Sequence, residues 1–279
     1  MKKVINALLL CIPIAAMIFT YARWLEPKWL DAHTVKINIQ GLDPRLEGLT
    51  ILHLSDLHQF RFGARQQKLL KAIGNENYDL VALTGDVLAY PNPYDFTPTA
   101  ELLQGLEAPV FFVYGNHDYP GYEALARDLT AAGVNILANS WQEFSCQGAT
   151  IQIAGVHDPH WTKNNPGSWL KTDFETAIQG TDPDTFTLLL SHSPGIIDWS
   201  TLAGVPLVLS GHTHGGQIKI PLLGAPLTAS GKLFDQYVQG LYRVENTQLY
   251  INRGLGTTGF PLRFLSRPEV VFLQLNSGN

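Results

Sequence analysis

The sequence predicts an α/β sandwich built on mixed sheets, and three observations lead to this prediction. Apolar, often β-branched runs recur along the chain, helical patterns fill some of the gaps between them, and no repeat or long linker divides the chain. The 279 residues, 45% hydrophobic and 15% charged, suit a single large domain with a sizeable core. We therefore expect one compact domain from residue 23 to residue 279.

The predicted elements follow from the hydrophobic pattern taken in chain order. Short apolar runs predict buried strands at 49–54, 80–83, 110–113, 151–154, 187–190 and 205–209. Helical periodicity predicts helices at 66–73 and 122–132, the second ended by Gly133. Three later runs, at 239–244, 249–252 and 270–275, predict further strands of a second sheet.

Charge and cysteine content exclude several classes of function. A net charge of -5 provides no basic field for the phosphate backbone, so we expect no nucleic-acid partner. The two cysteines, Cys11 and Cys146, stand far apart in the sequence and offer neither a disulfide framework nor a thiolate cluster. Any metal ion must therefore be bound by His, Asp and Asn.

The N-terminal segment 1–22 reads as a membrane anchor or a signal segment. After Lys2 and Lys3, residues 4–22 carry no charge, and as a helix they would be about 28 Å long, close to the thickness of a bilayer core. Asn6 and Pro13 weaken this interpretation. A cleaved secretory signal ending near Ala22 is the alternative, and an uncleaved transmembrane helix is the prediction we favour.

Polar clusters rich in histidine follow five of the predicted buried strands. Strand-end loops at one edge of a helix-covered sheet are where ligand sites form. Each cluster alone has an ordinary explanation as turn chemistry or a satisfied histidine, but together they predict a metal site. The candidate residues are Asp56, His58, Asp86, Asn116, His117, His192, His212 and His214.

The donor types indicate which metals such a site would bind. Carboxylate, imidazole and amide oxygen ligands suit Mn, Fe or Zn, and one shared carboxylate can hold two ions close together. A single structural zinc ion is the alternative, but the candidate ligands are too many for one closed tetrahedral site.

The order Asp-x-His, Gly-Asp, Gly-Asn-His-Asp, His, Gly-His-x-His resembles that of the calcineurin-like metallophosphoesterases. The N-terminal segment, Ser-Asp-Leu-His and Gly-His-Thr-His-Gly-Gly-Gln resemble the bacterial membrane-associated phosphodiesterase subgroup typified by YaeI and YkuE. The resemblance covers residues 49–220 through motifs and implies a four-layer α/β/β/α sandwich of two mixed sheets.

The resemblance also implies a role for each candidate residue. Asp56, His58 and His214 would hold one divalent ion, Asp86 would bridge two ions, and Asn116, His192 and His212 would complete the second site. Manganese is the expected metal, with Fe or Zn as alternatives. A metal-bridging hydroxide would attack the phosphorus of a phosphate diester, and His117 would stabilise the leaving group or act as general acid.

The expected function is therefore that of a metal-dependent phosphodiesterase acting on a small-molecule or lipid diester. The anchor makes a lipid-linked pyrophosphate or phospholipid hydrolase the alternative, and a non-catalytic metal-dependent protein-binding scaffold is a third hypothesis. We expect a single N-terminal span in the bacterial inner (cytoplasmic) membrane, with the catalytic domain outside the cytoplasm.

Several neighbouring residues allow two interpretations each. Asp118 would either orient His117 or cap the following turn, and Arg253 would either approach the metals or shape its own glycine-containing loop. His157 and His160 could line the cleft, whereas His53, inside a strand, is expected in the core.

Overall fold

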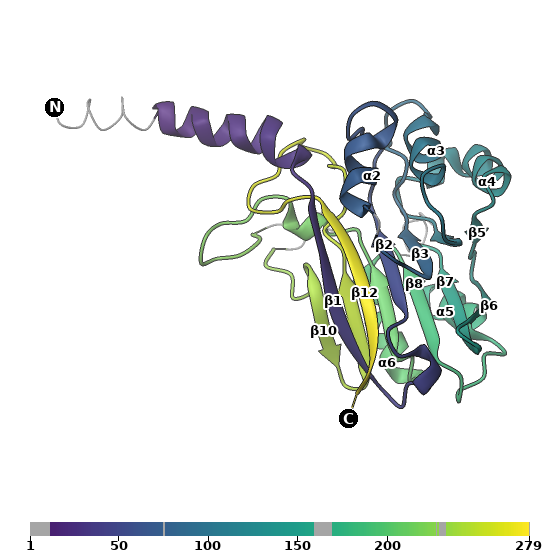
Figure 1. Cartoon of the computed structure of the whole chain (residues 1–279). Coiled ribbons are helices and arrows are strands. Elements are labelled where there is room, and N and C mark those ends of the chain that lie inside the picture. The colour runs from purple at the N-terminus through teal and green to yellow at the C-terminus, as the bar shows by residue number, and fades with distance from the viewer. Residues whose placement is uncertain (1–11, 75, 159–168, 227, 229–232, 279) are drawn as a thin grey trace.

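The computed structural model describes residues 12–74, 76–158, 169–226, 228 and 233–278, and these form two six-stranded sheets that pack face to face (Figure 1). The first sheet has the strand order β1-β12-β2-β3-β4-β5, and the second has the order β10-β11-β9-β8-β7-β6. Both sheets are mixed, as predicted, because each contains parallel and antiparallel pairs.

The strands of the first sheet are β1 (Asp31–Gln40), β2 (Thr50–Leu54), β3 (Leu80–Thr84), β4 (Val110–Val113), β5 (Asn135–Ile136) and β12 (Glu269–Gly278). From β2 to β5 neighbouring strands are parallel, so their carboxyl ends share one edge. Strands β2, β3 and β4 are buried almost throughout, which explains their continuous apolar sequences.

The strands of the second sheet are β6 (Ser140–Cys146), β7 (Ala149–Val156), β8 (Thr187–Ser191), β9 (Leu207–Ser210), β10 (Gly240–Val244) and β11 (Thr247–Ile251). Strands β7, β8, β9 and β11 run parallel to one another, and hairpin partners β6 and β10 close the two edges. The ends of β8 and β9 carry the second set of histidines.

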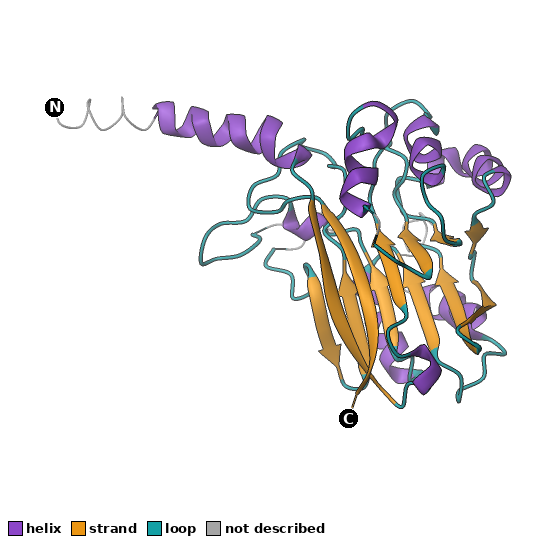
Figure 2. Ribbon diagram, in the orientation of Figure 1, coloured by secondary structure: helices purple, strands orange, loops and turns teal. Residues whose placement is uncertain are grey.

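Among the described residues, hydrophobic cores lie between the two sheets and between each sheet and its helices; Figure 2 distinguishes the helices from the strands by colour. One core lies between the sheets, where Ile51 and Leu80 of the first sheet meet Leu190 and Leu209 of the second. A second core packs α2 (Gln67–Ile73), α3 (Thr97–Leu103) and α4 (Tyr122–Ala131) on the first sheet. A third packs α5 (Trp169–Ile178) and α6 (Ile197–Leu202) on the other sheet. The arrangement is therefore an α/β sandwich.

One strand lies in a different sheet from the one predicted. The run at 270–275 is the core of β12, which belongs to the first sheet, where it pairs parallel with β1 and antiparallel with β2. Sequence runs show that a strand exists but do not specify its partner. The C-terminal strand therefore lies beside β2, which leads into the first candidate ligands.

The N-terminal residues differ from the prediction. Residues 12–20 are α-helical, followed by a π-helical turn (Tyr21–Leu25), and this helix extends away from the sheets (Figure 1). Among the described residues no helix is long and apolar enough to span a membrane. The predicted N-terminal span and inner-membrane location are therefore contradicted; residues 1–11 of the predicted segment lie outside the described residues.

Candidate metal centre

The candidate ligands come from loops at the carboxyl ends of parallel strands in both sheets. Asp56 and His58 follow β2, Asp86 follows β3, and Asn116 and His117 follow β4. From the facing sheet, His192 follows β8, and His212 and His214 follow β9. Because the sheets face each other, these loops meet at one edge of the sandwich, and the structure brings all eight predicted residues together.

The loops are held in uncommon backbone conformations. Asp56, His58, Asp86, His212 and His214 all have positive φ, between 48° and 70°. Such conformations persist in non-glycine residues only where surrounding contacts enforce them, and they are common at functional sites. Here the main chain provides those contacts, because the amides of Asp56 and His58 donate to the carbonyls of Gly85 and Asp86 at 3.0 and 2.9 Å.

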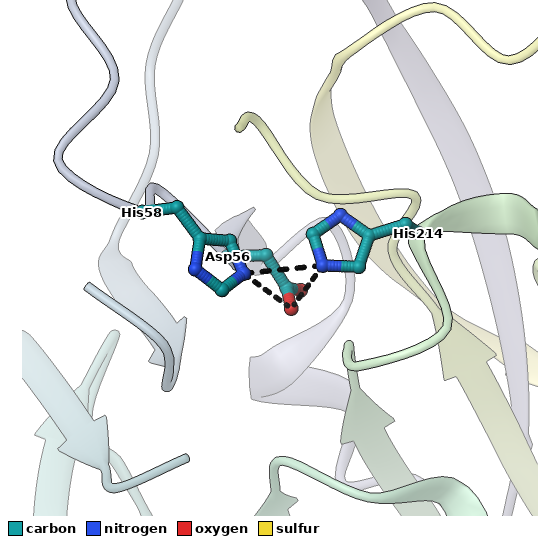
Figure 3. A group of neighbouring side chains, drawn as sticks. All are labelled: Asp56, His58 and His214. Atoms are coloured by element: carbon teal, nitrogen blue, oxygen red, sulfur yellow. Dashed lines mark hydrogen bonds and ion pairs between the residues drawn. The ribbon is translucent and has the colours of Figure 1, made fainter. Parts of the chain in front are cut away.

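The first ligand group consists of Asp56, His58 and His214 (Figure 3). The Nε2 atoms of the two histidines lie 3.1 Å apart, and they lie 3.8 Å (His58) and 3.3 Å (His214) from Asp56 Oδ1. All three side chains are buried. Two atoms that each bind one ion at about 2.1 Å lie roughly 3 to 3.5 Å apart, so this spacing suits a shared ion.

The second ligand group consists of Asp86, His192 and His212. His192 Nε2 lies 3.2 Å from Asp86 Oδ2 and 3.1 Å from His212 Nδ1. The amide oxygen of Asn116 lies 3.1 Å from the same His212 nitrogen. His192 is fixed from behind, because its Nδ1 donates to the carbonyl of Thr84 at 2.8 Å, which leaves Nε2 for a ligand.

Asp86 connects the two groups. Its Oδ2 lies 3.5 Å from His58 Nε2 and 3.2 Å from His192 Nε2, while its Oδ1 accepts the amide of His117 at 2.8 Å. The close packing depends on Gly115, where a Cβ atom would lie 2.2 Å from Asp86 Oδ1. A single carboxylate therefore faces histidines from both sheets.

Burial and neighbouring charges set the protonation of the centre. Burial raises the pKa of Asp56 to about 6 and lowers the pKa of His58 to about 3. Burial also lowers the pKa of His214 well below its usual range. Burial opposes ionisation of Asp86, but the charge of His192 and its hydrogen bond lower the pKa of this carboxyl overall. Neutral imidazoles and an ionised carboxylate are the forms that bind metal ions, so His58, His214 and Asp86 have the binding form. Burial opposes the charge of His192, but the carboxylate of Asp86 raises the pKa of this histidine overall, so His192 must release its proton to bind an ion.

A buried acceptor shows that the centre fits divalent ions. Asp56 Oδ1 is inaccessible to solvent and accepts no hydrogen bond from the protein, although three imidazole nitrogens face it at 3.3 to 4.0 Å. A buried carboxylate oxygen without a donor is costly, and a bound cation would satisfy it. The histidine, carboxylate and amide donors are those that Mn, Fe and Zn accept.

His117 differs from the buried ligands because it is half-buried. Its Nδ1 donates to the carbonyl of Tyr90 at 2.9 Å, and its Nε2 lies 3.3 Å from Thr258 Oγ1. Its ring stands edge-on to that of His58, with centroids 4.8 Å apart. The Tyr90 contact places the Nδ1 proton, so Nε2 is the atom that can exchange a proton with a substrate.

The structure decides several alternatives that the sequence left open. In the described part of the chain, the carboxylate of Asp118 hydrogen-bonds neither to the His117 ring nor to the amides of the following turn. It accepts the amides of Asp86, Gly115 and Leu88 at 2.8 to 3.0 Å and thus joins two ligand loops. Arg253 shapes its loop through ion pairs with Asp31 and Glu269.

The remaining histidines have separate positions. His53 lies in the core as predicted, fully buried, with Nε2 2.9 Å from Thr84 Oγ1. His157 stacks on Tyr114 with centroids 5.6 Å apart, and His160 lies outside the described residues.

Two residues at the centre were missed by the sequence analysis. Thr258 contacts His117, and Arg263, fully buried, lies 3.5 Å from His214 Nδ1. Both belong to the C-terminal loop between β11 and β12. The glycines at 254 and 256 were the available signal, since a Cβ at Gly254 would lie 2.7 Å from Asp56 Cβ.

The geometry defines a candidate metal centre, and comparison with known proteins shows the class of protein to which such a centre belongs. Residues 49–216 match the model of the calcineurin-like phosphoesterase family. The uncharacterized metallophosphoesterases YkuE and YkoQ of Bacillus subtilis are 35% and 31% identical, over 94% and 92% of this chain and 91% and 94% of theirs. Phosphodiesterase YaeI of Escherichia coli is 27% identical over 92% of each chain.

The chain therefore belongs to the calcineurin-like phosphoesterase family and is a metal-dependent phosphoester hydrolase. The predicted likeness to the YaeI and YkuE subgroup is confirmed. The family match ends at residue 216, so the C-terminal loop that carries Thr258 and Arg263 lies beyond it.

Proposed function

We propose that this chain is a dinuclear metal-dependent phosphodiesterase whose catalytic domain comprises residues 23–279. The observation that carries the proposal is the position of Asp86, whose Oδ2 lies within 3.5 Å of a histidine from each ligand group. One carboxylate between two groups of ligands is the arrangement that holds two ions side by side. The name of the relative YaeI supports a diester as the substrate.

The proposal assigns the ligands to two sites. Manganese is the proposed metal, with Fe or Zn as alternatives, given the mixed nitrogen and oxygen donors. When bound, the two ions would neutralise the phosphate oxygens and supply a hydroxide nucleophile at neutral pH. The first site would use Asp56, His58 and His214, the second would use Asn116, His192 and His212, and both would share Asp86.

The proposed role of His117 is to protonate the leaving alkoxide from Nε2. The Tyr90 carbonyl holds Nδ1, and the amide of His117 is fixed on Asp86 Oδ1 at 2.8 Å, so the ring keeps its orientation. Thr258 Oγ1 lies 3.3 Å from Nε2. A small-molecule diester would approach from the Nε2 side, because His117 and Asn116 are the half-buried members of the centre.

The test is hydrolysis of bis(p-nitrophenyl) phosphate by the full chain, stripped with chelator and supplied with Mn, Zn or Mg. We expect metal-restored turnover, a lower rate on p-nitrophenyl phosphate, and a loss of at least about 100-fold in Asp86→Asn, because the shared ligand is weakened. Asp198→Asn, on the exposed face of α6, is the control and should keep the parental rate.

The opposite result has a defined meaning. If the protein binds two ions but hydrolyses neither ester with any metal, the phosphodiesterase proposal is wrong and the binding-scaffold hypothesis gains. No described residue favours the lipid pyrophosphate alternative, which depended on a membrane-spanning segment.

A further inference from the structure

Arg263 is a fully buried arginine in the C-terminal loop, and its surroundings are unusual for a cation. Its guanidinium donates to the carbonyls of Arg253, Gly254, Gly256 and Ser266. Apart from His214 Nδ1 at 3.5 Å, these main-chain oxygens are its hydrogen-bond partners in the described part of the chain. An arginine buried without a carboxylate partner costs free energy, so its retention calls for a role.

The guanidinium contacts connect Arg263 to the loop of Asp56. Gly256, whose carbonyl accepts from Arg263 Nε at 3.1 Å, donates its amide to the carbonyl of Asp56 at 2.6 Å. A second hydrogen bond joins the same two segments: the amide of Leu255 donates to the carbonyl of Ser55 at 2.9 Å. Segment 254–256 therefore lies directly against the first ligand loop, and Arg263 holds that segment.

The same side chain connects to the loop of His214, which comes from the other sheet. Arg263 Nη1 donates to the carbonyl of Ser266 at 2.9 Å, and Ser266 Oγ donates to the carbonyl of His214 at 3.0 Å. Arg263 also contacts the His214 ring directly at Nδ1, and the other ring nitrogen of His214, Nε2, lies 3.3 Å from Asp56 Oδ1. One guanidinium thus links ligands from both sheets.

We propose that Arg263 is a positioning residue that holds Asp56 and His214 at the spacing the first metal ion requires. The second group, formed by Asp86, Asn116, His192 and His212, has one contact with Asp56, through the amide of His212, but is fixed mainly by others, such as those of Thr84 and Asp118. Loss of Arg263 therefore weakens one ion and spares the other. The inference rests on the proposed dinuclear function.

The test is a calorimetric titration of Mn²⁺ into the metal-stripped full chain, compared among wild type, Arg263→Lys and Arg263→Met. We expect two ions in the wild type and a loss of about 10 to 100-fold in affinity for one ion in both variants, as supporting contacts of ligands typically provide. The other ion should keep its affinity within about threefold. Lysine keeps the charge but not the planar fork that reaches four carbonyls.

A matched control and a spectroscopic readout separate positioning from general destabilisation. Arg45→Met removes an ion pair to Asp43 and a hydrogen bond to the carbonyl of Gly148 near the start of β2, away from the ligand loops, and should lower the unfolding temperature slightly without changing either affinity. Electron paramagnetic resonance at two equivalents of Mn²⁺ should show a coupled pair in wild type and the control, and isolated ions in the Arg263 variants.

The outcomes test the positioning role of Arg263 and the dinuclear function separately. Unchanged affinities in folded Arg263 variants, or equal losses at both sites, would overturn the positioning role. A wild type that binds fewer than two ions would instead contradict the dinuclear function. If Arg263→Met does not fold, Arg263→Lys, which keeps the stem and the charge, decides the matter.

Discussion

At the scale of single residues, burial distinguishes the histidine and aspartate ligands of the centre from His117, the proposed proton donor. The side chains of Asp56, His192 and His214 are almost completely inaccessible to solvent, so they can bind only an ion or molecule that enters the space between them. His117 is half-buried, and its Nε2 lies beside Thr258 Oγ1. Buried histidine and aspartate ligands beside one more exposed histidine suit a centre that passes a proton to its substrate.

The leaving-group role of His117 predicts a dependence on the alcohol that departs. His117→Gln should lower kcat by about 10² to 10⁴ for an alkyl leaving group, because the alkoxide then departs without a proton. The loss should be much smaller for p-nitrophenolate, which is stable as an anion. Steady-state kinetics on methyl and p-nitrophenyl diesters measures both.

Two controls accompany the His117 kinetics. His33→Gln changes a histidine that pairs with Glu269 at the edge of the first sheet, and it should leave both rates unchanged. Metal content of His117→Gln should also stay at the wild-type level. Equal losses for both leaving groups would show that His117 does not act as the proton donor.

At the scale of elements, strand ends were predictable but strand partners were not. The sequence predicted β4 at its observed bounds and β3 and β8 to within one residue, because buried strands have continuous apolar runs. Strands β1 and β6 were missed since they alternate with exposed polar residues. The place of β12 depends on pairing with β1 and β2, which no local pattern encodes.

In the candidate site, the ligands were predictable from local sequence but the residues that support them were not. Its eight side chains lie in short motifs directly after strands, so the sequence predicted them without a structure. Asp118 and Arg263 act through main-chain groups of distant loops, and such contacts leave no signature of residue type. What the sequence could not supply was therefore the support of the ligands.

The ligand loops after β3 and β4 approach each other closely at Gly115, so a methyl group added there should disturb the centre. Gly115→Ala would place Cβ 2.2 Å from Asp86 Oδ1 and 2.6 Å from its amide nitrogen, so Asp86 must move. We expect turnover to fall by at least about 100-fold and metal content to drop below the wild-type value. Elemental analysis with diester kinetics measures both quantities.

Gly195→Ala is the matched control for Gly115→Ala. Its nearest neighbour would be Ser193 Oγ at 3.7 Å, an ordinary contact, so rate and metal content should stay within twofold. If Gly115→Ala retained full metal content and rate, Asp86 would not be constrained by this contact. The exact position of Asp86 between the two ligand groups would then not be required for activity.

At the scale of the whole molecule, the ligands divide between the two sheets. Asp56, His58, Asp86 and Asn116 follow strands of the first sheet, and His192, His212 and His214 follow strands of the second. The apolar core between the sheets and a few hydrogen bonds, such as that from His192 Nδ1 to the carbonyl of Thr84, set their distance. Bound ions would add polar links across the same boundary, so metal binding and the packing of the sheets are coupled.

This coupling predicts that divalent ions stabilise the fold. A ligand at 100 times its Kd that binds only the folded state adds about 2.7 kcal/mol to the free energy of unfolding, which for a chain of this size raises Tm by roughly 5 °C. Thermal unfolding of the full chain with Mn²⁺ and with chelator should show this difference. Asp86→Asn should reduce it strongly, and Asp198→Asn should preserve it. An equal rise in wild type and Asp86→Asn would place the stabilising ion outside the centre, because a general surface effect does not depend on one buried carboxylate.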